Sequence, residues 1–254
     1  MTARHGACSL LSEAARFCDA ERRDAVADPR AQRNAAFTLL EMMIVVAIIA
    51  IMASAALPSF RQYRQNQALR AAVRTGATLF TRARTLAMAE NRTHIVLFNV
   101  GPGTDNCGNP IVDPASGNPV PVLVIDDGPA GAGNCCIDAG EEADLMPAAP
   151  ASSNVSWGVA LAGVPAPLDP GGAATWNTVG SSFATPAGVA ARGVMFRADG
   201  IPVTYTGACA LGSTGSGGGA IYVTNGQRDY AVVLSPIGAV SVEAFEPTAA
   251  VWGN

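Results

Sequence analysis

The sequence predicts an α+β protein in which a long N-terminal helix packs on an antiparallel β domain. Three observations support this prediction: an apolar run near the N-terminus, a helical spacing of apolar residues directly after it, and short apolar runs separated by turn residues in the rest of the chain. Most of the 27 glycines and 17 prolines lie beyond residue 100, which favours short strands and many turns over a helical bundle.

The first part of the helix is expected to cross a membrane. Phe37–Leu57 is an apolar run of 21 residues, and a helix of that length spans about 31 Å, close to the thickness of the hydrocarbon core. Arginines precede the run at Arg22, Arg23, Arg30 and Arg33. This charge bias predicts a cytoplasmic N-terminus and an outward-facing remainder.

The alternative for this segment is a secretory signal peptide. The basic start, the apolar run and the small residues Ala53-Ser54-Ala55 fit such a signal, and cleavage there would release a soluble protein. Glu41 inside the apolar run and the helical pattern that follows it both count against this interpretation.

Residues 59–92 are expected to continue the helix as an amphipathic half. Apolar residues recur there at spacings of three and four: Leu69, Val73, Gly76, Phe80, Ala83 and Ala87. Arginines occupy the other faces: Arg61, Arg64, Arg70, Arg74, Arg82 and Arg84. We interpret them as a solvated face that meets lipid headgroups and neighbouring subunits; a DNA-binding face is the alternative.

Pro58 divides the two halves of the expected helix. Proline removes one backbone hydrogen bond and kinks a helix, so we expect a bend there. A helix end at the membrane surface is the alternative, although the pattern beyond Pro58 argues against it.

The remaining residues, 93–254, are expected to form the β domain. His94–Val100 and Pro121–Asp126 read as paired strands, whereas residues 101–192 read as an irregular insertion with a possible strand at Asn154–Leu161. The C-terminal quarter is more regular. It predicts a strand at 193–197, a hairpin of 220–224 and 229–234 around Asn225-Gly226, and a last strand at 239–245.

The start of the apolar run carries a recognisable motif. Phe37-Thr38-Leu39-Leu40-Glu41, followed by the apolar residues 42–49 and by Pro58, resembles the N-terminal segment of type IV pilins and type II secretion pseudopilins. The resemblance implies a cytoplasmic leader of residues 1–36, cleavage by prepilin peptidase between Ala36 and Phe37, and methylation of the new N-terminus at Phe37. The family usually has glycine at the position of Ala36, so slower cleavage is expected.

The same resemblance implies a role for Glu41 in fibre assembly. A carboxylate at the centre of a bilayer costs about 2.5–3.5 kcal/mol on insertion scales. Cleavage creates an ammonium group at Phe37, and in the family fibre the glutamate of one subunit is thought to face the amine of its neighbour, which recovers electrostatic energy. A glutamate that snorkels to water near the interface is the alternative.

Two turns in the C-terminal half resemble those of one particular family within this group. Phe196-Arg197-Ala198-Asp199-Gly200 and Ser235-Pro236-Ile237-Gly238 are similar to turns of the secretion-protein-H/fimbrial-T family of minor pseudopilins. Some fimbrial-T-type members have arginines after the second turn and are linked with DNA uptake. Residues 239–242 contain no arginine and the outer domain is acidic, so we expect no nucleic acid partner.

Four cysteines lie in the expected outer domain: Cys107, Cys135, Cys136 and Cys209. An oxidising periplasm favours disulfides, and four cysteines allow three pairings. Adjacent cysteines rarely bond each other, so Cys135 and Cys136 are expected to reach the two distant partners. A zinc site is the alternative, although Cys-x-x-Cys pairs and a nearby histidine are lacking.

Metal binding and catalysis find little support in the sequence. The acidic run Asp138, Glu141, Glu142 and Asp144 does not have the spacing of a recognised calcium loop, so no metal is expected. His94 is the one histidine beyond the leader, and no nucleophile elbow or phosphate loop is present. We therefore expect no enzymatic activity and no cofactor.

Together, these features predict a minor pilin or pseudopilin, a single-pass protein of the bacterial inner membrane with a periplasmic β domain that later joins a fibre. Its expected partners are other pilin subunits, prepilin peptidase, the inner-membrane assembly platform and the lipid bilayer. The sequence does not separate a type II secretion pseudopilus from a type IV pilus. A secreted soluble binding domain and a DNA-uptake subunit are the alternatives.

Overall fold

The computed structural model describes residues 37–98, 103–105, 107–113, 115–127, 133–138, 143–146, 154–171, 176, 179–185, 187–206 and 209–253. The chain divides into two compact units, one ending at Ser54 and the other beginning at Ala55. Residues 1–36, which include the predicted leader and Ala36, lie outside the described residues.

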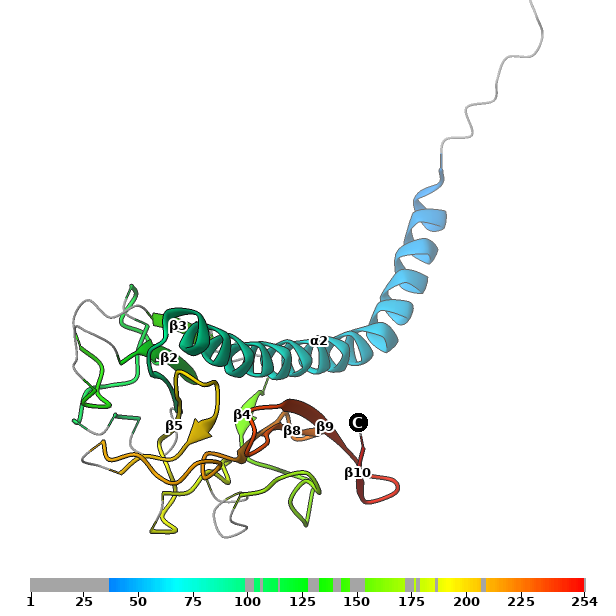
Figure 1. Cartoon of the computed structure of the whole chain (residues 1–254). Coiled ribbons are helices and arrows are strands. Elements are labelled where there is room, and N and C mark those ends of the chain that lie inside the picture. The colour runs from blue at the N-terminus through cyan, green and yellow to red at the C-terminus, as the bar shows by residue number, and fades with distance from the viewer. Residues whose placement is uncertain are drawn as a thin grey trace, which may run out of the picture. The chain divides into compact units, whose positions relative to one another are not determined.

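The predicted long helix is α2, which covers Leu39–Glu90 and contains 52 residues (Figure 1). It continues through Pro58, so a helix end at that residue is wrong. Pro58 has no N–H group to donate to the carbonyl of Ser54, which is the physical basis for the predicted kink; the kink itself stays a prediction.

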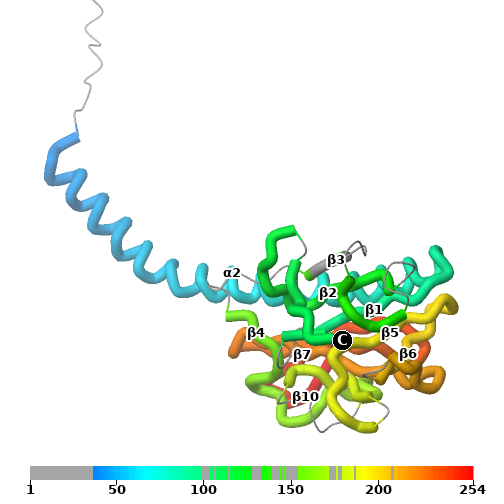
Figure 2. Tube along the Cα trace, turned by 90° about the vertical axis from the view of Figure 1, so that its left-hand side faces the viewer, coloured from blue at the N-terminus to red at the C-terminus, as the bar shows by residue number. Residues whose placement is uncertain are grey.

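The β domain is antiparallel, as predicted, and it consists of two sheets. The first has the strand order β3-β2-β1-β5-β6. Its strands are β1 (His94–Phe98), β2 (Val122–Asp126), β3 (Ala143–Met146), β5 (Gly193–Phe196) and β6 (Pro202–Val203). Figure 2 shows β2, β1, β5 and β6 as neighbours.

The second sheet has the order β10-β9-β8-β7-β4. Its strands are β4 (Ser156–Trp157), β7 (Gly219–Thr224), β8 (Asp229–Leu234), β9 (Val240–Glu246) and β10 (Val251–Gly253). The predicted hairpin is the β7–β8 pair, in which Thr224 lies opposite Asp229.

Two details of the prediction need correction. The strand expected at Asn154–Leu161 is only Ser156–Trp157, because Gly158 has a φ of 100° and the next residues follow a loop. The insertion also contains β3, a strand that the sequence did not predict, beside the expected strands that form β2 and β4.

The main core lies between α2 and the two sheets. The apolar stripe predicted from the helical spacing is buried, as is Leu79 beside it. Phe80 contacts Phe98 and Phe183, with ring centroids 6.0 and 5.9 Å away. Val96 and Phe98 of β1 join this core, as do Ile221 of β7 and Val232 of β8, so the helix packs on both sheets.

Loops cover the opposite faces of both sheets. Ile95 and Leu97 of β1 pack against Ile111, Cys135 and Tyr205 on the outer face of the first sheet. On the second sheet a separate cluster forms from Ala166, Trp176, Ala220, Tyr222, Ala231, Val233, Phe245 and Trp252. The central strands are therefore buried on both faces and lack the alternation of a half-exposed strand.

The two turns that carry the finer resemblance meet at α2. Gly200 and Gly238 have φ angles of 75° and 82°, which glycine adopts without strain. A Cβ on Gly200 would lie 2.7 Å from Sδ of Met88, and one on Gly238 would lie 2.8 Å from the carbonyl oxygen of Gly200. Arg84 donates a 2.8 Å hydrogen bond to the carbonyl of Gly238, which fixes the second turn to the helix.

Candidate functional site

The start of α2 has a well-defined cap. Thr38 immediately precedes the helix, and its hydroxyl accepts a 3.1 Å hydrogen bond from the N–H of Glu41. The carbonyl of Thr38 accepts a bond from the N–H of Met42 at 3.2 Å. Thr38 and Glu41 have the Thr-x-x-Glu spacing of a capping box, which defines a helix N-terminus.

Glu41 therefore has a local role in capping the helix, in addition to its predicted role in fibre assembly. It lies in the first turn of α2, where the positive end of the helix dipole favours a carboxylate. Phe37, the predicted new N-terminus, lies directly before Thr38. Cleavage before Phe37 would add the full positive charge of an ammonium group, four residues from this carboxylate, to the partial positive charge of the helix end.

Beyond Glu41 the helix is free of charge for a long distance. Residues 42–60 contain no Asp, Glu, Lys or Arg, and the next charged residue is Arg61. Glu41 and Arg61 are separated by about 30 Å along a helix, so they lie at the two ends of a segment that matches the hydrocarbon thickness.

The side chains of this segment are exposed on every face of the helix. Phe37 is 73% exposed and Ile51 is 70% exposed, and every other residue from 37 to 64 is exposed as well. A helix that is apolar all round is stable only when something outside it covers it. Within the described residues, α2 is the one helix long and apolar enough to cross a membrane.

The arginines of the second half of α2 fall into two groups. Arg61, Arg64, Arg70 and Arg74 are exposed, as expected for a solvated face. Arg82 forms an ion pair with Asp144. Arg84 is half-buried against the turn at Gly238, so its assignment to the solvated face is wrong.

The cysteines form two disulfides, Cys107–Cys136 and Cys135–Cys209. Each of the two adjacent cysteines thus reaches a distant partner. Sulfur atoms in disulfides are not thiolate ligands, which excludes the alternative zinc site at these cysteines. The bonds anchor loops that cover the outer face of the first sheet, where Cys135 is buried among apolar side chains.

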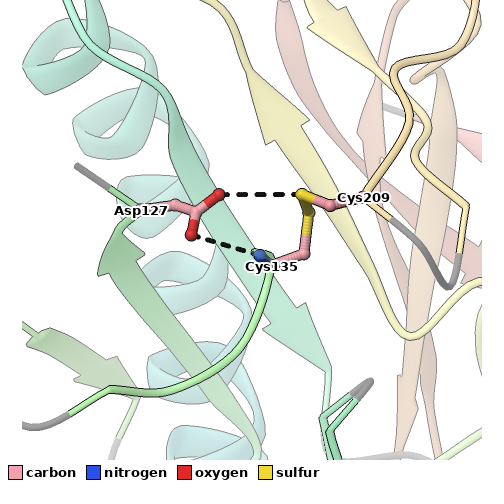
Figure 3. A group of neighbouring side chains, drawn as sticks. All are labelled: Asp127, Cys135 and Cys209. Carbon is pink, nitrogen blue, oxygen red and sulfur yellow. Dashed lines mark hydrogen bonds between the residues drawn. A yellow bond between two sulfur atoms is a disulfide. The ribbon is translucent and has the colours of Figure 1, made fainter. Parts of the chain in front are cut away.

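Asp127 lies against the second disulfide (Figure 3). One carboxylate oxygen accepts a 3.2 Å hydrogen bond from the N–H of Cys135, and the other lies 3.8 Å from Sγ of Cys209. Burial raises the pKa of Asp127 to about 6, and the neighbouring charges of Asp138 and Asp126 act in the same direction. A protonated Asp127 can donate to the disulfide sulfur, which has no proton of its own.

The acidic run considered for calcium does not act as one group among the described residues. Asp138 accepts a 2.8 Å hydrogen bond from the side-chain amide of Asn134, and Asp144 pairs with Arg82. Glu141 and Glu142 lie outside the described residues.

Comparison with known proteins identifies one feature. Residues 31–57 match the family model of the prokaryotic N-terminal methylation motif. Searches of curated proteins and of solved structures found no match. The matched residues include the predicted cleavage position, the cap at Thr38 and most of the exposed apolar segment.

The motif match agrees with the geometry of this segment. An exposed apolar helix that begins at a capped N-terminus and carries one carboxylate in its first turn fits a membrane-anchored pilin. The motif implies assembly with other pilin subunits. The chain carries a prepilin-type methylation motif, which supports the type IV pilin and pseudopilin superfamily and indicates a subunit processed by prepilin peptidase.

Proposed function

We propose that the chain is a minor pilin or pseudopilin of the secretion-H/fimbrial-T type, a structural subunit without enzymatic activity. Prepilin peptidase cuts between Ala36 and Phe37, the new N-terminus is methylated, and the subunit enters a type II secretion pseudopilus or a type IV pilus. The observation that carries this proposal is the methylation motif on a helix whose apolar side chains are exposed on all faces.

Assembly follows from the electrostatics of the first turn. Before cleavage the nitrogen of Phe37 is in an amide bond and carries no charge. After cleavage it is an ammonium group, and methylation preserves the charge. Glu41 of one subunit then pairs with Phe37 of the next, which offsets the cost of removing both charges from water and sets the axial register.

The remaining partners follow from the two halves of α2. The apolar half inserts into the lipid bilayer of the inner membrane before assembly and packs in the fibre core afterwards. The exposed arginines beyond it, among them Arg61 and Arg64, suit anionic headgroups and the inner-membrane assembly platform.

A nucleic acid partner is not expected in the outer domain. Residues 93–254 contain thirteen acidic residues and three arginines, and this excess of negative charge repels a polyanion. The β domain is instead proposed to present a protein-binding surface at or near the fibre tip, where it acts in protein secretion or in fibre initiation.

The direct test is recovery of the chain in fibres sheared from cells. A subunit of this kind is expected in the sheared fraction of wild-type cells and in the membrane fraction of cells that lack prepilin peptidase. Finding it in the culture medium as a free soluble protein, independent of the peptidase, would support a secreted domain instead. Loss of enzyme secretion in a deletion strain would identify a pseudopilus, and loss of surface pili would identify a type IV pilus.

A further inference from the structure

Three side chains with metal-binding atoms meet at the end of α2. Glu90 is the last residue of the helix, His94 is the first residue of β1, and Asp126 is the last residue of β2. His94 and Asp126 are directly paired in the register of the two strands. One ligand atom from each of the three side chains lies within 4.8 Å of the others.

His94 lacks a satisfactory partner in this cluster. Its side chain is 3% exposed, and the nearest carboxylate oxygen, Oε2 of Glu90, lies 3.6 Å from Nε2, which is longer than a hydrogen bond. Oδ1 of Asp126 is buried without a hydrogen-bond partner among the described residues. Buried polar atoms of this kind normally have a partner, because leaving them unpaired is costly.

The electrostatics at this position favour a cation. The negative end of a helix dipole normally attracts a basic side chain, but the last turn of α2 contains none and ends in the carboxylate of Glu90. Arg92 supplies one positive charge nearby, and its guanidinium donates a 3.2 Å hydrogen bond to Oδ2 of Asp126. Among the described residues, Oδ1 of Asp126 has no hydrogen-bond partner and Glu90 has only the 3.6 Å contact with His94, so both carboxylates can take another ligand.

We propose that Glu90, His94 and Asp126 bind a divalent metal ion of the zinc type. One imidazole and two carboxylates are ligands that zinc accepts, and a fourth position stays open to water on the exposed side of Glu90. Ligand atoms on a tetrahedral zinc ion lie about 3.4 Å apart. This is close to the 3.6 Å between Nε2 of His94 and Oε2 of Glu90, which are the ligand atoms of these two residues. The bound ion ties the end of the helix to the first sheet.

This site differs from the metal sites considered from the sequence. It uses neither the cysteines, which form disulfides, nor the acidic run at 138–144. The β1–β2 pairing brings His94 and Asp126 together, and the end of α2 adds Glu90. The site does not depend on the proposed fibre function.

The test measures binding of Zn²⁺ alone by equilibrium dialysis. The full chain is used in detergent micelles, with the thiols of Cys8 and Cys18 alkylated so that they cannot bind the metal. We expect one saturable site in the wild-type chain and at least a tenfold loss of affinity in Glu90→Ala and in His94→Ala. Glu90 lies at an exposed helix end, so Glu90→Ala is expected to fold even if the buried His94 does not tolerate replacement.

Two control variants and one variant with an expected gain of affinity test the assignment further. His5→Ala removes the other histidine of the chain and Glu246→Ala removes an exposed carboxylate of β9, and neither is expected to change the affinity. Arg92→Gln removes a competing positive charge and is expected to tighten binding severalfold.

Zinc-edge absorption spectroscopy on the wild-type complex is expected to show nitrogen and oxygen ligands without sulfur. No saturable site, sulfur ligation, or a site unchanged by Glu90→Ala would each overturn the proposal.

Discussion

The two halves of α2 are equally helical but differ in where their apolar side chains go. In the second half one stripe, from Leu69 to Ala87, packs on the two sheets, and charged side chains occupy other faces. In the first half and the residues that flank it, 37–60, apolar side chains lie on every face and remain exposed. The second half is therefore stabilised by its own chain, whereas the first must be covered by lipid or by other subunits.

The size of the exposed surface makes this conclusion firm. Fourteen large apolar side chains of residues 37–60 are exposed: Phe37, Leu39, Leu40, Met42, Met43, Ile44, Val45, Val46, Ile48, Ile49, Ile51, Met52, Leu57 and Phe60. Burying such side chains is worth about 1.5–3 kcal/mol each, so full coverage of the segment is worth on the order of 20–40 kcal/mol. That gain is large compared with the cost of one carboxylate in a bilayer.

The strongest test of the first half is the charge of Glu41. Glu41→Gln keeps the capping-box spacing but removes the charge, and Glu41→Val removes both. We expect both variants to insert into the membrane normally and to enter fibres at least tenfold less well than wild type. Quantitative immunoblots of sheared fibres and of membranes measure this.

Thr38→Ala is the matched control for the cap. It removes the hydroxyl that accepts from the N–H of Glu41 while leaving the carboxylate, so fibre incorporation is expected to fall much less. Normal incorporation of Glu41→Gln would show that the charge does not drive assembly.

The second half of α2 is tested by truncation in the core. Phe80→Ala removes a fully buried ring that contacts Phe98 and Phe183, so the free energy of unfolding of the β domain is expected to fall by about 3–5 kcal/mol. Ile48→Ala, in the exposed first half, is expected to leave that free energy unchanged. Chemical denaturation of the full chain in detergent measures both, and equal effects would remove the distinction between the halves.

The disulfides are expected to stabilise the β domain and to have no effect on membrane insertion. They close sequence separations of 74 residues for Cys135–Cys209 and 29 residues for Cys107–Cys136. Loop-closure entropy predicts a loss of about 3.5–4.5 kcal/mol when either pair is replaced by alanine, slightly more for the longer loop. Urea denaturation tests this, and membrane insertion is expected to be unaffected; a larger loss from the shorter loop would contradict the entropic account.

The smallest expected effect concerns Asp127. Its pKa is raised from 3.8 in the unfolded chain to about 6 in the fold, so the fold favours the protonated form. The stabilisation that protonated Asp127 contributes to the fold is complete below about pH 4 and is lost as the pH rises through about 6. Asp127→Asn is expected to remove that part of the pH dependence and to raise stability at neutral pH by about 1 kcal/mol.

Urea denaturation of wild type and Asp127→Asn between about pH 4 and pH 7.5 measures the difference. A variant whose stability curve stays parallel to the wild-type curve across that range would show that Asp127 is not protonated by the fold.

The sequence predicts those parts of the fold that depend on local patterns. The helical spacing identifies the buried stripe of α2, and Asn225-Gly226 identifies the β7–β8 hairpin. Strands β3, β6 and β10 are short edge strands that form because a neighbouring strand offers free backbone groups, so their own residues carry little signal.

The covering loops could not be predicted for a similar reason. Asp229 accepts hydrogen bonds from the backbone N–H groups of Ala160, Leu161 and Ala162, which are separated from it by 67 to 69 residues. A contact between a carboxylate and distant backbone groups leaves no periodic pattern in the sequence.

The same division holds for the two candidate sites. Phe37 and Glu41 belong to a contiguous motif that is readable from the sequence, and the cap at Thr38 was missed although its Thr-x-x-Glu spacing is visible there. The cluster of Glu90, His94 and Asp126 depends on the register between β1 and β2, which the positions of the three residues along the chain do not reveal.

Intact-mass and N-terminal peptide analysis of membrane-extracted protein determines where the mature chain begins. We expect a chain that begins at an N-methylated Phe37 in cells with prepilin peptidase and a full-length chain in cells without it. A chain beginning at Ala56, or one that keeps its leader in the presence of the peptidase, would show that the segment is not processed as a prepilin.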